Sequence, residues 1–362
     1  MLQLQSKRNA NEVVSRLRQL YQRQAADRIF ATFKLPNPAL DEFARTYGDG
    51  ECGYPEPAAR VAFWDRYFAA RADLEDDSIP AAYLSEMDQG LYGGMVGGEV
   101  RFMSHPDNGW ISSMVAPLLA DWSEFDRLRI DRAAPWFQRY LTQLDTFVEA
   151  AAGKFGISHF ILIDSLNFVF ELVGATNTYV SLLEQPELVR RAIDFACDLN
   201  VLVQDTFFER VGLLAGGTAS NMVQWIDGRV VSESVDPFHM TSVDYFEAWG
   251  REPVERILGR YDGGVLHIHG NGRHLLQAVS SLAGLKAIYL GDDRGFPQAF
   301  DVLRELQART GDVPLAVSVA WDHFVAGLRR RTLPGGVLYQ VTEAGSVEAV
   351  NRLMDQVRAY RT

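Results

Sequence analysis

Short runs of apolar, often β-branched residues alternate along this chain with longer stretches in which apolar residues recur at helical spacing. This alternation is typical of parallel α/β architecture. The apolar runs predict eight strands, at Arg28–Lys34, Ile79–Leu84, Ile157–Ile163, Met222–Ile226, Gly263–His269, Lys286–Leu290, Val313–Val319 and Gly336–Val341. Helices are predicted at Pro135–Ala152, Pro186–Arg210, Ser242–Arg260, Arg273–Leu282, Pro297–Thr310 and Ser346–Tyr360. Eight strands with crossover helices predict a (β/α)8 TIM barrel, with an extra excursion from Glu99 to Ile111 before the third strand.

The residues before the first predicted strand carry a helical pattern of their own. Val13, Leu17, Leu20 and Tyr21 recur on one face of a helix expected over Asn11–Gln24. We therefore expect an N-terminal helical extension, residues 1–27, followed by one barrel domain, residues 28–362. Two alternatives are open for the apolar face of this helix. It docks a second subunit, which would give a homodimer, or it caps the bottom of the barrel.

Composition and charge exclude several classes of protein. Of the 362 residues, 47% are hydrophobic, so the chain can bury a large core without a disulfide or metal staple. The net charge of −12 argues against general nucleic-acid binding. The most apolar run, Phe160–Ala175, contains Asp164 and Glu171 and therefore does not predict a membrane span. The chain has only two cysteines, which fits a reducing cytoplasm. We expect a cytoplasmic protein that binds a small molecule.

Polar residues that follow the predicted strands are the candidate chemistry, because the active sites of such barrels lie at the carboxyl ends of the strands. His267 and His269 are two residues apart in the fifth run, so their side chains point the same way. Such a pair can bind a metal, hold an anionic substrate or shuttle protons. The alternative is a pair of histidines that bond neighbouring carbonyls. Asp88 precedes a glycine-rich turn and lies either at the rim of a pocket or in a surface turn.

Other strand ends supply weaker candidates. Substrate-binding roles are expected for Asp164, Asn167, Trp225, Asn271, Asp292 and Tyr339. For single polar residues at these positions, capping of the next helix is an equally good explanation. Glu343, after the eighth strand, is a further pocket candidate.

The order of these features resembles the uroporphyrinogen decarboxylase superfamily, which also contains zinc-dependent methyltransferases that move methyl groups from corrinoid proteins to thiols. The resemblance runs from about Arg28 to Tyr360. It is carried by Asp88–Phe102, by Glu171–Gly174 with Leu182–Val189, by Asp236-Pro237 with Thr241–Phe246 and Arg256-Ile257, and by His267-Ile-His-Gly-Asn271. The last of these is similar to the methyltransferases' His-x-Cys-Gly-Asn. The family fold is a (β/α)8 barrel, in agreement with the strand count.

The resemblance implies a decarboxylating lyase that needs no cofactor. Asp88 would stabilise a protonated, electron-deficient intermediate, while His267 and His269 would bind a carboxylate or shuttle a proton. Two family features are absent. Phe33–Pro38 lacks the arginines that grip substrate carboxylates, and the late His-Gly pair is replaced by Tyr339–Glu343. The substrate is therefore expected to be a small or pyrrolic carboxylate rather than uroporphyrinogen itself.

The main alternative is a zinc-dependent methyltransferase of the same superfamily. Those enzymes hold zinc with one histidine and two cysteines. Here His269 stands where the first cysteine would be, and no cysteine follows Cys197. A zinc site would instead consist of His267, His269 and Glu343, a harder ligand set that suits polarisation of oxygen better than activation of a thiol. A third alternative, from a different class, is a barrel without catalytic activity that binds a ligand or partner.

Overall fold

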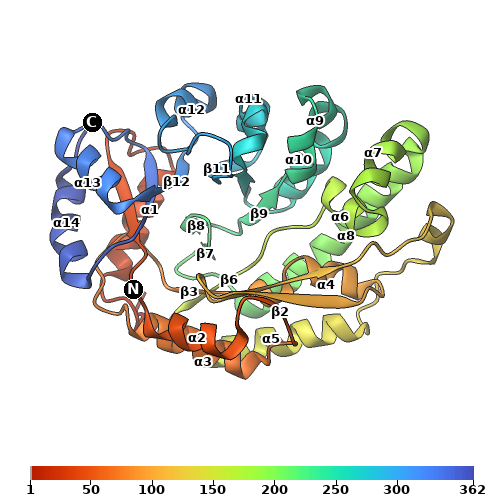
Figure 1. The fold of residues 1–362 in the computed structure, drawn as a ribbon, viewed down its shortest axis with the longest axis horizontal. Helices are drawn as coiled ribbons and strands as arrows, with labels where there is room; N and C mark the ends of the chain where they lie inside the picture. Colours follow the sequence, from red (N-terminus) through yellow and green to blue (C-terminus); the bar gives the residue numbers. More distant parts are fainter. Residues whose placement is uncertain (1) are drawn as a thin grey trace.

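The computed structural model, which describes residues 2–362, is built around a central parallel sheet (Figure 1). Six strands form this sheet in the order β1-β13-β12-β11-β10-β9, and β3 and β6 form a separate parallel pair. Single backbone hydrogen bonds link the segments next to this pair to the sheet, from Asp77 N, before β3, to Ala31 O (2.9 Å) and from Leu162 N, after β6, to Ser232 O (2.8 Å). The α/β class is therefore confirmed, whereas the regular ladder spans six strands rather than a closed ring of eight.

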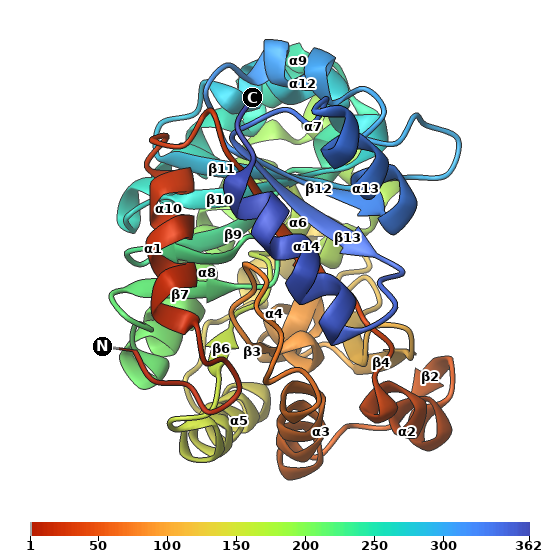
Figure 2. The ribbon, with the colours of Figure 1, turned by 90° about the vertical axis from the view of Figure 1, so that its left-hand side faces the viewer.

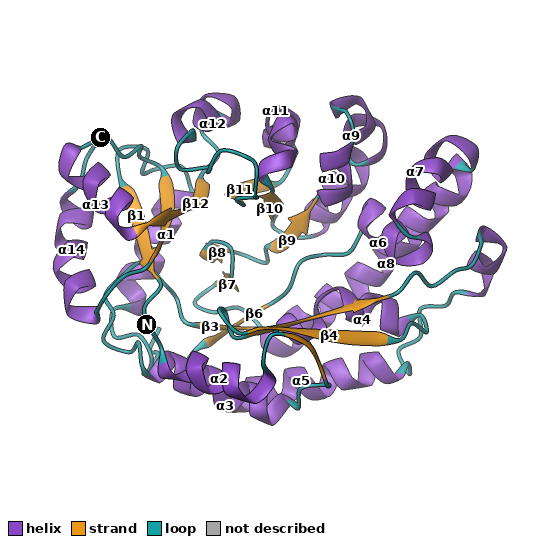
Figure 3. Ribbon diagram, in the orientation of Figure 1, coloured by secondary structure: helices purple, strands orange, loops and turns teal. Residues whose placement is uncertain are grey.

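The strands are β1 (Ile29–Phe33), β2 (Gly50–Cys52), β3 (Ala81–Tyr83), β4 (Val100–His105), β5 (Trp110–Val115), β6 (Gly156–Ser158), β7 (Gly217–Ser220), β8 (Gln224–Asp227), β9 (Val231–Ser234), β10 (Gly264–Ile268), β11 (Leu285–Leu290), β12 (Leu315–Ala320) and β13 (Val337–Thr342). The helices are α1 (Ala10–Tyr21), α2 (Pro38–Tyr47), α3 (Pro57–Ala69), α4 (Asp88–Met95), α5 (Pro135–Ala151), α6 (Ser165–Val173), α7 (Ala175–Glu184), α8 (Pro186–Val211), α9 (Val243–Trp249), α10 (Arg251–Arg260), α11 (Leu276–Ser280), α12 (Leu303–Thr310), α13 (Trp321–Arg330) and α14 (Val347–Ala359). Figure 3 shows helices lying outside the strands.

Seven of the eight predicted strands coincide with parallel strands of the fold, and the fourth does not. Met222–Ile226 overlaps β8, which pairs antiparallel with β7, and β9 takes the fourth place in the parallel series. The run is apolar because it packs against α1, not because it belongs to the sheet. The expected excursion is the antiparallel pair β4–β5, extended by β2. The helix predicted over Ser242–Arg260 is two helices, α9 and α10, that meet at Gly250.

Alternation along the strands divides their side chains into two sets. One set points outward and packs between the strands and the helices. The other set points inward, and its lowest layer consists of Phe30, Val265, Ala287, Ala316 and Leu338. Together with α1 and the β7–β8 hairpin, these residues form an apolar base, which we call the floor. Figure 2 shows α1 beside β7. The apolar face of α1 is therefore buried within its own chain, as the capping alternative predicts.

Lys7, just before α1, ties the N-terminal segment to the rest of the fold. Its buried Nζ donates to Leu74 O, Asp76 O and Asp76 Oδ1 at 2.7–2.8 Å. In the same region, the Asp76 and Asp77 carboxylates accept from the backbone N–H groups of Phe33 and Ala31 in β1. Side chains thus replace ladder hydrogen bonds where the regular sheet stops. No helix within residues 2–362 is both long enough and apolar enough to cross a membrane.

Candidate active site

Directly above the floor lies an open cavity of about 860 Å³. Two residues further along each strand, the inward layer changes from apolar to polar, and the side chains there line the cavity: Thr32, His267, Tyr289, Ser318 and Gln340. The ladder pairs His267 with Tyr289 and both Thr32 and Ser318 with Gln340, and the Tyr289 and Ser318 side chains are hydrogen-bonded to each other. We call these five side chains the polar tier. Asp88, His269 and residues of the β4–β5 hairpin complete the lining. The site thus sits at the carboxyl ends of the strands, as expected for parallel α/β folds.

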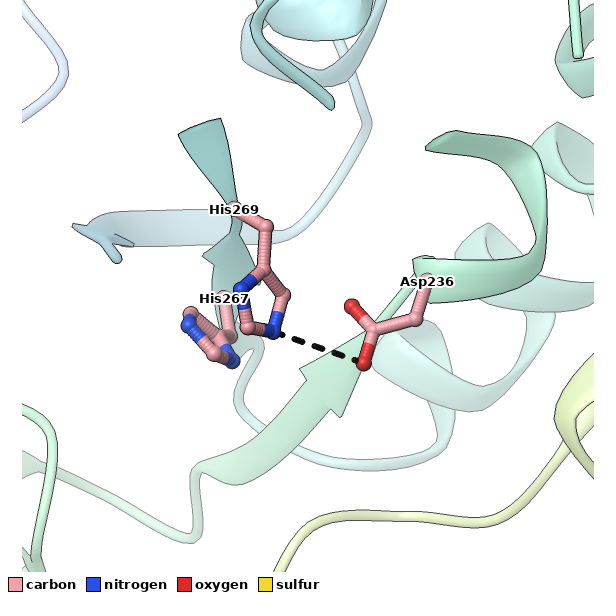
Figure 4. Close-up of side chains that lie close together, drawn as sticks. All are labelled: Asp236, His267 and His269. Carbon is pink, nitrogen blue, oxygen red and sulfur yellow. Dashed lines mark ion pairs between the residues drawn. The ribbon is translucent and has the colours of Figure 1, made fainter. Parts of the chain in front are cut away.

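Two histidines and a carboxylate converge at the edge of this cavity (Figure 4). His267 and His269 come from the end of β10, and Asp236 comes from the 3-10 helix that follows β9. One ligand atom from each of the three lies within 4.8 Å of the other two. The ion pair drawn in Figure 4, from His269 Nε2 to Asp236 Oδ2, measures 3.8 Å. Among the described residues, this is the one group of at least three potential metal ligands.

The surroundings of both histidines leave nitrogen lone pairs free. Nδ1 of His269 is hydrogen-bonded to Asp293 Oδ1 at 2.9 Å, which places the proton on Nδ1 and leaves Nε2 facing Asp236. Burial lowers the pKa of His267 to about 3, with His269 as the next cause, so this imidazole is neutral at physiological pH. The ring of His267 packs on Tyr289, with 5.1 Å between ring centroids. Its Nε2 lies so close to Gly291 that a Cβ there would be 2.7 Å away.

Asp88, at the start of α4, brings a second kind of chemistry to the cavity. Burial raises its pKa to about 7, so both protonation states are populated near neutral pH. Glu171, from α6, is also raised to a pKa of about 7, first by burial and then by the charge of Asp88. Its Oε2 is buried without a hydrogen-bond partner. Sequence reasoning did not select Glu171 as a site residue. The available signal was a glutamate inside an otherwise apolar run.

Three further predicted residues make structural hydrogen bonds around the site. Asp292 lines the cavity, but its Oδ1 accepts from Ala299 N (2.6 Å) and from Arg273 Nη2 (3.2 Å). Asn271 follows the histidines, and its backbone N–H points at Asp293. Asn167 donates to Ser234 O at 2.8 Å and so ties α6 to the end of β9. Of these three, only Asp292 is part of the cavity lining.

Asp164 is fully buried at the start of α6, beside Glu233 of β9. Burial is the main cause that raises the pKa of Asp164 to about 6 and holds that of Glu233 well above its usual range. Two carboxyl groups buried side by side do not both ionise readily, so one of them keeps a proton near neutral pH. Neither lines the cavity.

Trp225 and Tyr339 were expected to bind substrate and lie elsewhere. Trp225 is fully buried in the floor, and its Nε1 donates to Leu214 O at 2.7 Å. Tyr339 belongs to the outward set of β13, where it packs on Phe324 of α13 and donates to Pro334 O at 2.7 Å. The inward neighbour is Gln340. Burial of both aromatic side chains against protein leaves them no surface for a ligand.

Glu343 also stands apart from the expected metal site. It is exposed just after β13, in a left-handed backbone conformation with φ of 63°, and it is not a member of the histidine group. The carboxylate that joins His267 and His269 is Asp236. Sequence had pointed to Asp236 only through the Asp236-Pro237 resemblance. Its proximity to β10 depends on the parallel pairing of β9 with β10, which no local pattern reveals.

Comparison with solved structures finds eleven matching chains. One is a methyltransferase from Methanosarcina mazei, with a TM-score of 0.62 over 96% of this chain and 98% of that one, at 14% sequence identity. The two proteins share a fold. At this identity the comparison concerns the fold alone. No protein-family model and no curated protein sequence matches the chain.

Proposed function

We propose that this protein is a metal-dependent transferase with zinc bound by Asp236, His267 and His269, and that methyl transfer to or from a small molecule is its reaction class. The observation that carries the proposal is the convergence of these three side chains, of which His267 and His269 line the cavity. The fold shared with a methyltransferase favours this reaction over decarboxylation. We further propose that the fold is a (β/α)8 barrel in which the β3–β6 pair completes the ring of strands. The regular strand-to-strand hydrogen bonding is interrupted on both sides of this pair.

The ligand set fits a catalytic rather than a structural zinc. Three protein ligands, two nitrogen and one oxygen, are the usual number when a fourth position is left for water or substrate. His269 is oriented by Asp293 in the carboxylate–histidine arrangement common around such metals. Zinc at this position would act as a Lewis acid and lower the pKa of a nucleophile bound to it. Without thiolate ligands, the site suits an oxygen or nitrogen nucleophile.

The residues of the chain would handle the proton and the substrate. Asp88 lines the same cavity as the histidines and, with its pKa of about 7, can take up or release a proton at neutral pH. Ser318 and Gln340, both in the cavity lining, would hydrogen-bond the substrate; Gln340 Nε2 also donates to Met222 O at 2.7 Å. Trp110 and Tyr83, with their rings 5.0 Å apart, supply an aromatic wall.

Zinc analysis of protein purified without a metal-affinity tag tests this proposal. We expect about one zinc per chain in the wild type and in Asp107→Asn, a control that changes an exposed aspartate of the same cavity. Asp236→Ala and His269→Ala should lose the metal. Absence of zinc from the wild type, even after incubation with Zn²⁺, would overturn the proposal. If the wild type binds zinc, methyl-donor substrates are screened with the zinc-loaded protein by mass spectrometry.

Decarboxylation is the second candidate, and the perturbed pKa of Asp88 is the observation that favours it. A substrate with several carboxylates needs several cations in the cavity. Lys7 and Arg71 line it, but Lys7 is bonded to Asp76, and Arg71 donates to Phe33 O and the Tyr67 hydroxyl. Lys34, whose Nζ donates to Asn108 Oδ1 at 3.0 Å, is the most accessible cation of the lining. Turnover of carboxylated pyrroles by metal-free protein, followed by NMR, would favour this candidate.

A further inference from the structure

Asp236 lies between two histidines, and each of its carboxylate oxygens faces one of them. Oδ2 is 3.8 Å from Nε2 of His269, on the side of the histidine group. Oδ1 is 3.6 Å from Nδ1 of His239, three residues further along the chain. Oδ1 is itself buried and has no hydrogen-bond partner. A distance of 3.6 Å is too long for a hydrogen bond, so a small rotation of the carboxylate would be needed to form one.

His239 is buried beside Asp236, on the same 3-10 helix. Its side chain is 2% exposed. The ring lies against Gly272, where a Cβ would come within 2.2 Å of the imidazole Cδ2 and 2.4 Å of Nε2. Nε2 is buried without a partner. An unpartnered N–H is more costly to bury than an unpartnered lone pair, so the favoured tautomer has its proton on Nδ1, which faces Asp236.

We propose that His239 is a positioning residue for the metal site: after a small rotation of the Asp236 carboxylate, its Nδ1–H donates to Asp236 Oδ1 and so presents Oδ2 to a metal held by His267 and His269. The inference rests on the proposed function, because it needs a metal at that site. His239 is not itself one of the ligands. Its nitrogens fall outside the group whose ligand atoms all lie within 4.8 Å of one another, and its ring centroid is 5.7 Å from that of His269.

Metal titration of His239 variants tests the inference. His239→Asn keeps an amide donor near the position of Nδ1, whereas His239→Leu removes the donor but retains an apolar side chain. His274→Asn is the matched control, because His274 is exposed and bonds only the carbonyls of Asn271 and Thr241. Affinity for Zn²⁺ is measured by competition with a chromophoric chelator, and the visible spectrum of the Co²⁺-loaded protein reports ligand geometry. Thermal unfolding of the metal-free proteins shows whether each variant is folded.

Loss of a partner that orients a metal ligand typically lowers affinity 10–100-fold. We expect that loss, with an altered Co²⁺ spectrum, in His239→Leu. His239→Asn should stay within about threefold of the wild type, and His274→Asn should be unchanged. If His239→Leu does not fold, His239→Gln replaces it. The amide of glutamine is one bond further along the side chain, so it points toward Gly272 and leaves no donor facing Asp236.

Three results would count against the inference, and they are distinguishable. Wild-type affinity and an unchanged spectrum in His239→Leu would show that His239 does not position Asp236. Complete loss of the Co²⁺ bands in both the Leu and Asn variants would identify His239 as a ligand instead. Absence of Zn²⁺ and Co²⁺ binding by the wild type would overturn the proposed function, and this inference with it.

Discussion

Asp88→Asn should make the protein more stable at neutral and alkaline pH. The folded-state pKa of Asp88 is raised from 3.8 to about 7, mainly by burial. Between these two values the folded protein holds a proton that the unfolded chain releases, so the free energy of unfolding falls as pH rises through this window. Asparagine is neutral at every pH and removes this loss.

The size of the effect follows from the shift. A difference of about 3 pKa units at 1.36 kcal/mol each corresponds to roughly 4 kcal/mol. The carboxyl is partly exposed to the cavity, so solvent screening lowers the expected gain to about 2 kcal/mol at pH 8. Roughly 60% of it develops between pH 5 and pH 8. Neutral asparagine also relieves Glu171, whose pKa is raised in part by the charge of Asp88.

Urea unfolding at pH 5, 6, 7 and 8 measures the effect, with Asp107→Asn as the control. Asp107 is an exposed aspartate of the same cavity, and its variant should follow the wild-type pH dependence. We expect the stability difference between Asp88→Asn and wild type to grow with pH. A variant that is less stable than wild type at pH 8, with a parallel pH dependence, would refute the reasoning, because it would mean that the ionised carboxylate is stabilised in the folded state.

Three more substitutions test the placement of single side chains. Trp225→Ala should lower the free energy of unfolding by about 3–5 kcal/mol in urea titrations, because it leaves a cavity in the floor. A loss under about 1 kcal/mol would contradict the burial of Trp225. Tyr339→Phe should cost about 1 kcal/mol, the value of its hydrogen bond to Pro334 O, and leave zinc content unchanged; a loss of zinc would place Tyr339 at the site after all. Gly291→Ala should weaken zinc binding at least tenfold with little change in stability, because the new Cβ displaces His267; unchanged affinity would show that His267 is not a ligand.

Much of the fold could be predicted from the sequence because the information is local. Strand and helix periodicities identify seven of the parallel strands, and spacing by two shows that His267 and His269 point the same way. The fourth strand was wrong because an apolar run that forms part of the floor has the same composition as a buried strand. Local sequence also does not decide which of the two alternating sets of side chains on a strand points inward. In β13, the inward residue of the polar tier is Gln340 and not Tyr339, and only the pairing with β1 and β12 decides this.

The candidate site shows the same division. Asp88 and the two histidines follow strands and could be selected from the sequence. Asp236, His239 and Glu171 join them from other segments, through the packing of β9 on β10 and of α6 near α4. Nothing in the sequence near these residues indicates that partnership. Sequence reasoning therefore finds residues at strand ends more readily than residues brought in by tertiary contact.

The floor joins the two ends of the chain, and this has a consequence for biosynthesis. Its residues come from α1, within the first 21 positions, and from Leu338 in β13, near the last. Strand β1 likewise pairs with β13. On the ribosome, the apolar face of α1 emerges some 300 residues before its final partner is made, and such long-range closure is slow. The nascent chain therefore carries an incompletely covered amphipathic helix until β13 is made, and a stop codon before β13 would remove Leu338 from the floor and leave β1 without its strand partner.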